Sequence, residues 1–186
     1  MATHTDRRRP SAGFWLLVPV AAVVTWGVHE FAHFQAGRWL GYEMWVSMNQ
    51  AGLVKGDYTS DGHRMLVAMA GPFVTYLQAA AALWWILVRR SYAAYPFLFL
   101  AFFTRAVAFA VGMAKPNDEA RTSLDLGWPV WVLPSIAVGC LLVLTIIGSR
   151  TLRVGWRTNG LLYVAVSVIA TAIVFGDPLV GRIAQG

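Results

Sequence analysis

The feature of this sequence that most constrains its fold is a series of long apolar segments. Five runs, each near or above the roughly 20 residues that a helix needs to cross the hydrocarbon core of a bilayer, follow one another along the chain. Runs of this length, separated by polar and basic connections, are typical of transmembrane helices. We therefore expect an all-α, multi-pass membrane protein whose five spanning helices cover residues 14–40, 64–88, 93–113, 129–149 and 160–183.

Composition and charge agree with a membrane location. Hydrophobic residues make up 58% of the 186 positions and charged residues 13%, which lies outside the usual range of soluble domains. The net charge of +6 would suit nucleic acid, but the arginines lie in short clusters beside the apolar runs, as in membrane proteins. We therefore expect the lipid bilayer as a partner, and no nucleic acid. The single cysteine, Cys140, excludes a disulfide framework and a cysteine-rich metal site.

The arginine clusters also predict an orientation. Alternate connections carry most of the arginines, and the remaining connections mix basic residues with several acids. Because cytoplasmic loops of membrane proteins are enriched in lysine and arginine, we expect the arginine-rich side, which includes the N-terminus, to face the cytoplasm. The clustered residues are Arg7, Arg8, Arg9, Arg89, Arg90, Arg150, Arg153 and Arg157.

Residues 26–37, Trp-Gly-Val-His-Glu-Phe-Ala-His-Phe-Gln-Ala-Gly, place three ionisable side chains near the end of the first apolar run. On a helix, His29 and His33 lie one turn apart on the same face, with Glu30 beside them. This is the HExxH arrangement, in which two imidazoles share a zinc ion and the glutamate accepts a proton from water. A chance triplet on a polar helix face is the alternative.

The apolar surroundings favour a metal site over a chance triplet. One ionisable residue inside a spanning segment costs about 2.5–3.5 kcal/mol, so three of them together require a compensating partner. A bound dication would supply that compensation. We therefore expect Zn²⁺ as the cofactor, with His29 and His33 as metal ligands and Glu30 as the catalytic base.

A third zinc ligand has to come from elsewhere in the chain, because an open catalytic zinc generally has three protein ligands and one water. The polar segment 115–125 follows the third run and lies on the side of the membrane where the first run ends. Asp118 can begin a short helix whose free backbone N–H groups orient its carboxylate, and it is the favoured ligand. Asp125 is the alternative, and we expect Glu119 to face solvent.

The connection between the first two runs, residues 41–63, lacks a helical pattern. Residues 42–48 alternate with a period of two, which predicts a small β-hairpin with a turn at residues 50–52 and a second strand at residues 53–58. An interfacial loop is the alternative. A hairpin here would offer a strand edge that captures an extended peptide by β-addition.

A single charge interrupts the third apolar run. Arg105 lies near its middle, and a charge at that depth is costly unless it is paired. We expect Arg105 to form a structural ion pair with a buried acid. Asp118 or Glu30 is within its reach only if the helix is tilted or bent.

These motifs in combination resemble the site-2 protease family of intramembrane zinc metalloproteases. The HExxH sequence is followed by Ala-Gly-Pro at residues 70–72 and by an aspartate after the third run, and the similarity covers residues 14–125. The resemblance implies a zinc metalloendopeptidase with a three-helix catalytic core that hydrolyses peptide bonds of a transmembrane protein substrate. Residues 1–186 then form one polytopic domain in which residues 129–183 are two accessory helices. The roles carried over are those of the metal ligands His29, His33 and Asp118 and of the catalytic base Glu30.

The chain departs from the family's pattern in two places. Thr75 stands where the family usually has an asparagine after its Gly-Pro, and neither Asp118 nor Asp125 lies in the family's Leu-Asp-Gly context. The family's site is generally reached from the cytosol, whereas the arginines here place the motif on the outer side. A second function therefore stays open, that of a catalytically inactive relative acting as a binding or adaptor protein. A small metal or proton carrier using the same ligands is a third.

Overall fold

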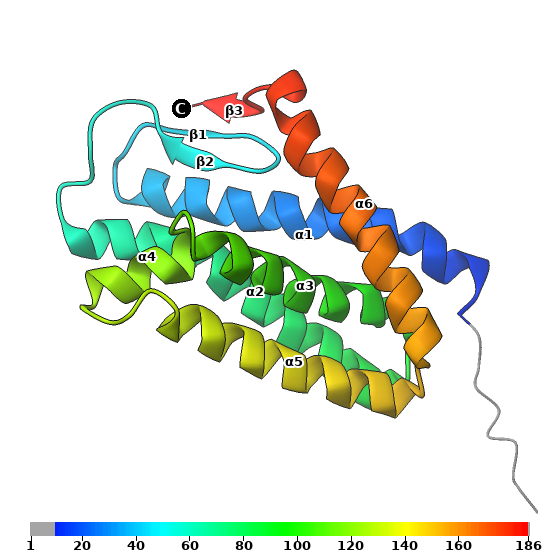
Figure 1. Ribbon diagram of the computed structural model, residues 1–186. Helices are drawn as coiled ribbons and strands as arrows, with labels where there is room; N and C mark the ends of the chain where they lie inside the picture. The colour runs from blue at the N-terminus through cyan, green and yellow to red at the C-terminus, as the bar shows by residue number, and fades with distance from the viewer. Residues whose placement is uncertain (1–9, 186) are drawn as a thin grey trace, which may run out of the picture.

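The computed structural model describes residues 10–185, and within them five helices are long and apolar enough to cross a membrane. The sequence-based expectation of an all-α, multi-pass membrane protein is confirmed (Figure 1). A single 3₁₀ turn precedes the third span, and one short helix follows it. The helices are α1 (Ala12–Trp39), α2 (Asp61–Arg89), α3 (Tyr95–Gly112), α4 (Asp118–Asp125), α5 (Val132–Leu152) and α6 (Trp156–Val180), and the turn is η1 (Tyr92–Ala94).

The helix ends differ from the predicted ones by a few residues, because polar caps and turns set them. Helix α2 starts at Asp61, before the apolar run, since the Ser60 hydroxyl accepts a hydrogen bond from the backbone N–H of His63. Helix α6 ends at Val180, before the predicted end at residue 183, because Gly181 has a positive φ of 73°, a backbone conformation outside the helix that glycine adopts readily.

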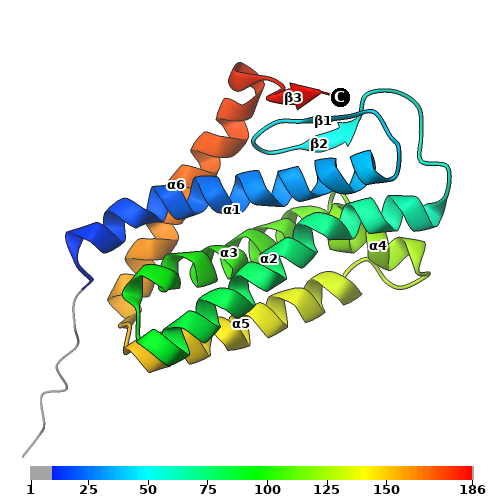
Figure 2. The same ribbon diagram turned by 180° about the vertical axis from the view of Figure 1, so that it is seen from behind.

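The apolar core lies among the spanning helices, and α2 contacts α1, α3, α4 and α5. Helix α6 crosses α1 and contacts α3 only slightly, so most of its surface is exposed (Figures 1 and 2). Large apolar side chains also cover the outer faces of the other helices, as expected where lipid replaces water. Core residues include Val18, Ala22, Ile86, Leu98, Leu141 and Leu162.

The hairpin between α1 and α2 is present, but its predicted turn and second strand are wrong. Strands β1 (Met44–Val46) and β2 (Ala51–Leu53) pair antiparallel, with the turn before residue 51 and no strand at residues 54–58. Ser47 closes this turn, because its N–H donates to the Gln50 carbonyl at 2.8 Å and its hydroxyl accepts from the Gln50 N–H at 3.1 Å.

A third strand, β3 (Ala184–Gln185), pairs with β1 on its other side, so the sheet order is β2-β1-β3. No sequence pattern predicts this strand. The hairpin lies over the C-terminal half of α1 (Figures 1 and 2). Gly37 of α1 permits that approach, since a Cβ on it would lie 2.8 Å from Cγ of Met44.

Helix α6 is tied to the hairpin through one buried carboxylate. Asp177 accepts a hydrogen bond from the Ser47 hydroxyl at 2.8 Å and another from the backbone N–H of Asn49 at 3.2 Å. The last turn of α6 and the strand that follows it therefore fix the hairpin in its position over α1. This tie joins residues about 130 positions apart in the sequence.

Candidate metal centre

The two histidines of the HExxH motif lie on the buried face of α1. His29 and His33 are 6% and 7% exposed, and their Nε2 atoms are 3.1 Å apart, as their spacing of one helical turn predicts. Gly71 of α2 packs directly against them. A Cβ at Gly71 would lie 2.7 Å from Nε2 of His29 and closer still to Nε2 of His33. The glycine therefore lets α2 pack against both imidazoles.

Hydrogen bonds on the far side of each ring set its orientation. Nδ1 of His33 donates to the carbonyl of Val67 at 2.7 Å, and that carbonyl can only accept. Nδ1 of His29 lies 3.0 Å from the Thr75 hydroxyl, which gives its own hydrogen to the carbonyl of Gly71 at 3.1 Å. With Nδ1 protonated in both rings, the two Nε2 lone pairs face each other across the site.

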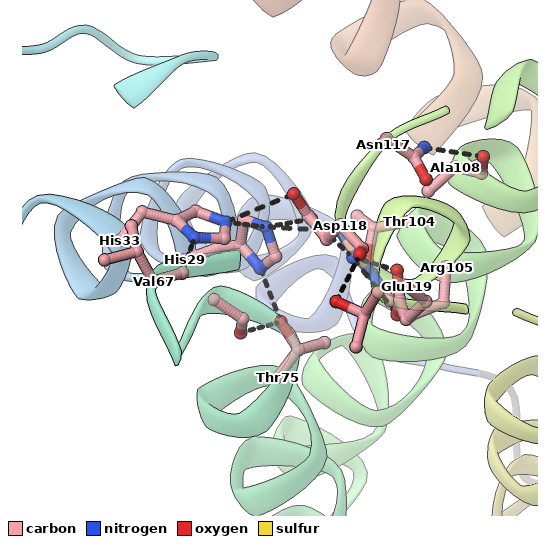
Figure 3. Close-up of polar contacts among 12 residues, drawn as sticks. His29, His33, Val67, Thr75, Thr104, Arg105, Ala108, Asn117, Asp118 and Glu119 are labelled. Atoms are coloured by element: carbon pink, nitrogen blue, oxygen red, sulfur yellow. Dashed lines mark hydrogen bonds and ion pairs between the residues drawn. The ribbon is translucent and has the colours of Figure 1, made fainter. Parts of the chain in front are cut away.

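Asp118 is the acid that the fold brings to these rings (Figure 3). It is the first residue of α4, and its Oδ2 lies 3.2 Å from Nε2 of His29 while its Oδ1 lies 3.6 Å from Nε2 of His33. Burial opposes the ionisation of this carboxyl, but the two imidazoles and Arg105 outweigh it and hold the pKa of Asp118 well below its ordinary value. The acid is therefore present as a carboxylate.

The chemistry of this donor set fits a divalent metal ion. Two nitrogen lone pairs and a carboxylate oxygen converge on one point, with their ligand atoms within 4.8 Å of one another. Imidazole and carboxylate together are ordinary ligands of zinc and related transition metals. His29, His33 and Asp118 are thus the residues that would hold such an ion.

The alternative aspartate does not reach the histidines. Asp125, at the end of α4, forms a bidentate ion pair with Arg64 of α2, with Oδ1 to Nη2 at 2.8 Å and Oδ2 to Nε at 3.1 Å. Of the two aspartates that the sequence left open, the fold places Asp118 beside the rings and gives Asp125 a separate partner.

Arg105 pairs with buried acids, as expected, but one of these acids was misassigned. Its Nη1 donates to Oδ2 of Asp118 and to Oε2 of Glu119, each at 3.1 Å. The prediction that Glu119 faces solvent is wrong, because it is 2% exposed and also accepts a hydrogen bond from the Tyr76 hydroxyl at 2.8 Å. The signal was available in the sequence, since a charge inside a span demands an acid partner and Glu119 adjoins Asp118.

A cavity of about 470 Å³ opens beside these ligands. Glu30 lines this cavity and is only partly buried. Among residues 10–185, no group lies within hydrogen-bond or ion-pair distance of its carboxylate. Burial raises the pKa of Tyr58, which also lines the cavity, so its phenol stays protonated. The helices and the hairpin contribute further lining residues, which include Thr25, Asn49, Gln50, Ala51, Arg105, Asp118 and Val174.

Comparisons of the chain with models of known protein families, with curated proteins and with solved structures find no match. The function proposed below therefore depends on the residues and their geometry. The residues that sequence reasoning missed are the ones that orient the rings. Val67 acts through its backbone carbonyl, which leaves no trace in residue type, and Thr75 was noted only as a departure from a family pattern.

Proposed function

We propose that this chain is an intramembrane zinc metalloprotease, a zinc-dependent metalloendopeptidase that hydrolyses peptide bonds of membrane-embedded protein substrates. The resemblance to the site-2 protease family suggests this activity. The observation that supports it most is the convergence of His29, His33 and Asp118 beside a cavity that Glu30 also lines, inside a bundle of helices able to span a membrane.

Zinc held by these residues would supply Lewis-acid chemistry, polarising a peptide carbonyl and activating water. Glu30 then has a defined task in the hydrolysis. It takes a proton from the water whose oxygen bonds to the carbonyl carbon, and it returns that proton to the peptide nitrogen as the C–N bond breaks. Its place in the cavity wall and its lack of a described ionic partner leave the carboxylate free for this transfer.

The charges around the ligands support a role for Asp118 as the anionic ligand. Arg105 and Glu119 carry opposite charges and pair directly, so they contribute no net charge to the site. The carboxylate of Asp118 therefore remains to offset part of the charge of a dication. Val67 and Thr75, which hold the imidazoles by Nδ1, keep each Nε2 available for the metal.

The edge of β2 is a place where an extended substrate can pair. In the register of the hairpin, Trp45 pairs with Gly52, and the N–H of Ser47 donates the next backbone hydrogen bond to the Gln50 carbonyl. The backbone N–H and C=O of Ala51 therefore point away from β1, toward an edge that no described strand covers. Ala51 also lines the cavity, so a substrate strand added there would lie next to the metal ligands.

The expected partners are a transmembrane protein substrate and the lipid bilayer. A helical substrate hides its carbonyls in its own hydrogen bonds, so it has to unwind locally before a strand edge can hold it. From the arginine distribution, we propose that the N-terminus is cytoplasmic and that the HExxH end of α1 faces the opposite side.

Metal analysis and cleavage assays on the purified chain test this function. The full chain would be reconstituted in lipid nanodiscs with a library of synthetic single-span peptides, and fragments would be identified by mass spectrometry. We expect zinc in wild type and in Glu30→Gln, and cleavage by wild type alone. Glu43→Gln is the matched control, because Glu43 is an exposed acid that pairs with Lys55. Cleavage by a clean Glu30→Gln preparation would refute the role of Glu30.

A second candidate function is that of a catalytically inactive relative that binds or escorts a membrane protein. One observation favours it: the Thr75 hydroxyl, at the position of the family's asparagine, is committed to His29 and to the Gly71 carbonyl. It therefore has no hydrogen left for a substrate. A chain that captures membrane peptides but neither cleaves them nor holds zinc would support the binding function.

A further inference from the structure

A hydrogen-bond donor to the carbonyl oxygen accelerates peptide hydrolysis as negative charge develops on that oxygen, in addition to the polarisation that a metal ion would supply. A preorganised donor at this position commonly contributes about 100- to 1,000-fold to the rate. Thr75 cannot serve, because its one hydrogen goes to the carbonyl of Gly71. A hydrogen bond to this oxygen would therefore come from another group near the ligands.

Arg105 of α3 is placed to do so. Its side chain is 7% exposed, lines the cavity and lies beside Asp118 and Glu119 (Figure 3). Nη1 carries the hydrogen bonds to both of these carboxylates. Nη2 faces the other way: its one described contact is with Nε2 of His29, at 3.4 Å. The guanidinium therefore has one amino group for its ion pairs and one aimed at the metal-binding point.

Metal binding changes what this second amino group can contact. The lone pair on Nε2 of His29 is the one that a metal ion takes, so Nη2 of Arg105 then loses its acceptor. A buried donor without an acceptor is unfavourable. A peptide carbonyl that enters from the cavity would supply a new acceptor, and this hydrogen bond would strengthen as the oxygen becomes anionic.

The surroundings also hold the guanidinium still and compensate its charge. Glu119 accepts from Nη1 through both carboxylate oxygens, at 3.3 and 3.1 Å, and the Tyr76 hydroxyl fixes Glu119 in turn. Two other cationic side chains along the cavity have partners of their own. Arg64 pairs with Asp125 of α4 and Asp61 of α2, and Arg121 donates to the Pro116 carbonyl.

We propose that Arg105 is a catalytic residue whose Nη2 donates a hydrogen bond to the carbonyl oxygen of the scissile peptide. This assignment rests on the proposed proteolytic function. It places the hydrogen-bond donor for the carbonyl oxygen on α3, and not on α2 at the position of Thr75. No covalent bond to Arg105 forms, and its proton stays on the guanidinium throughout.

The test uses the double variant Arg105→Gln/Glu119→Gln, which removes both members of the Arg105–Glu119 ion pair, while Asp118 loses its contact with Arg105 and keeps its contacts with the two imidazoles. Arg90→Gln is the control, because Arg90 is exposed and donates to the Thr151 carbonyl at the opposite end of α2. Each purified full-length chain would be measured for bound zinc. Affinity would be measured for two apolar peptides of the same sequence, one with a phosphinic group and one with a thiol. The phosphinic group mimics the tetrahedral oxyanion, whereas the thiol binds the metal without such oxygens.

We expect the double variant to bind zinc and the thiol peptide like wild type and to bind the phosphinic peptide about 100- to 1,000-fold more weakly. Its kcat for any cleaved reporter peptide falls by a similar factor, with little change in KM. Arg105→Lys keeps the positive charge but lacks the second amino group of the guanidinium. It should show the same selective loss of phosphinic-peptide affinity, and it provides the test if the double variant fails to fold.

The outcomes separate the two proposals. A wild-type chain that binds no metal overturns both of them. A metal-loaded wild type with unchanged phosphinic affinity in the variants, or with no phosphinic binding at all, overturns the assignment of Arg105 alone. Loss of zinc from the variants overturns it as well, because Arg105 would then act only by positioning Asp118.

Discussion

Replacing Gly71 by alanine is the most direct test of how closely α2 packs against the two imidazoles. The new Cβ would lie 2.7 Å from Nε2 and Cε1 of His29 and closer still to Nε2 of His33. Favourable contacts between such atoms lie at about 3.5–4.0 Å, so the helices have to separate by about 1 Å. Metal sites tolerate ligand displacements of only about 0.2 Å.

The expected loss follows from that displacement. A misplacement of about 1 Å costs about 100-fold in catalysis, and overpacking of a tight contact costs about 1–3 kcal/mol of stability. We therefore expect Gly71→Ala to lower peptide cleavage about 100-fold and to weaken zinc binding. Competition with a chromophoric chelator would measure the zinc affinity, and thermal unfolding in detergent would measure the stability.

Gly27→Ala is the matched control for this variant. Gly27 lies on α1, two residues before His29, and a Cβ there would have no other atom within 4 Å. Alanine in a helix interior is more favourable than glycine by about 0.5–1 kcal/mol, so this variant should be as stable as wild type or more so. If Gly71→Ala bound zinc with wild-type affinity and unfolded at the wild-type temperature, the close packing inferred here would be wrong.

Three further predictions follow from other contacts. Thr75→Val should lower zinc affinity about 10- to 100-fold in a chelator titration while Thr75→Ser preserves it, and equal affinity in both would exclude an orienting role. Asp177→Ala removes the carboxylate that accepts a hydrogen bond from the Ser47 hydroxyl, so the free energy needed to open the hairpin turn should fall by about 1–3 kcal/mol. Hydrogen exchange would measure this change, and unaltered protection would count against the tie. Zinc at about 1,000 times its Kd should stabilise the chain by about 4 kcal/mol in thermal unfolding. Asp118→Asn should abolish this shift and Asp125→Asn should keep it, and the reverse pattern would exchange the two aspartates.

Much of the architecture could be predicted from local sequence. The five spans depend only on the length and hydropathy of consecutive residues, which is why they were found with ends a few residues in error. The closeness of His29 and His33 is also local, since four residues make about one helical turn. The buried face that carries them continues along α1 through Val18 and Thr25.

The identity of the acid beside the rings was not local. Asp118 and Asp125 lie seven positions apart in similar polar sequence, and only the packing of α4 on α2 gives one of them to the histidines and the other to Arg64. The burial of Glu119 depends on the same packing.

The sequence by itself determined the membrane-spanning helices and the paired imidazoles, because both arise from interactions within one segment. The tertiary structure alone decided which carboxylate meets the rings, which groups hold their Nδ1 atoms and which strand covers β1. Each of those contacts joins residues distant in the chain, and the free energy that selects among such partners comes from packing whole elements together.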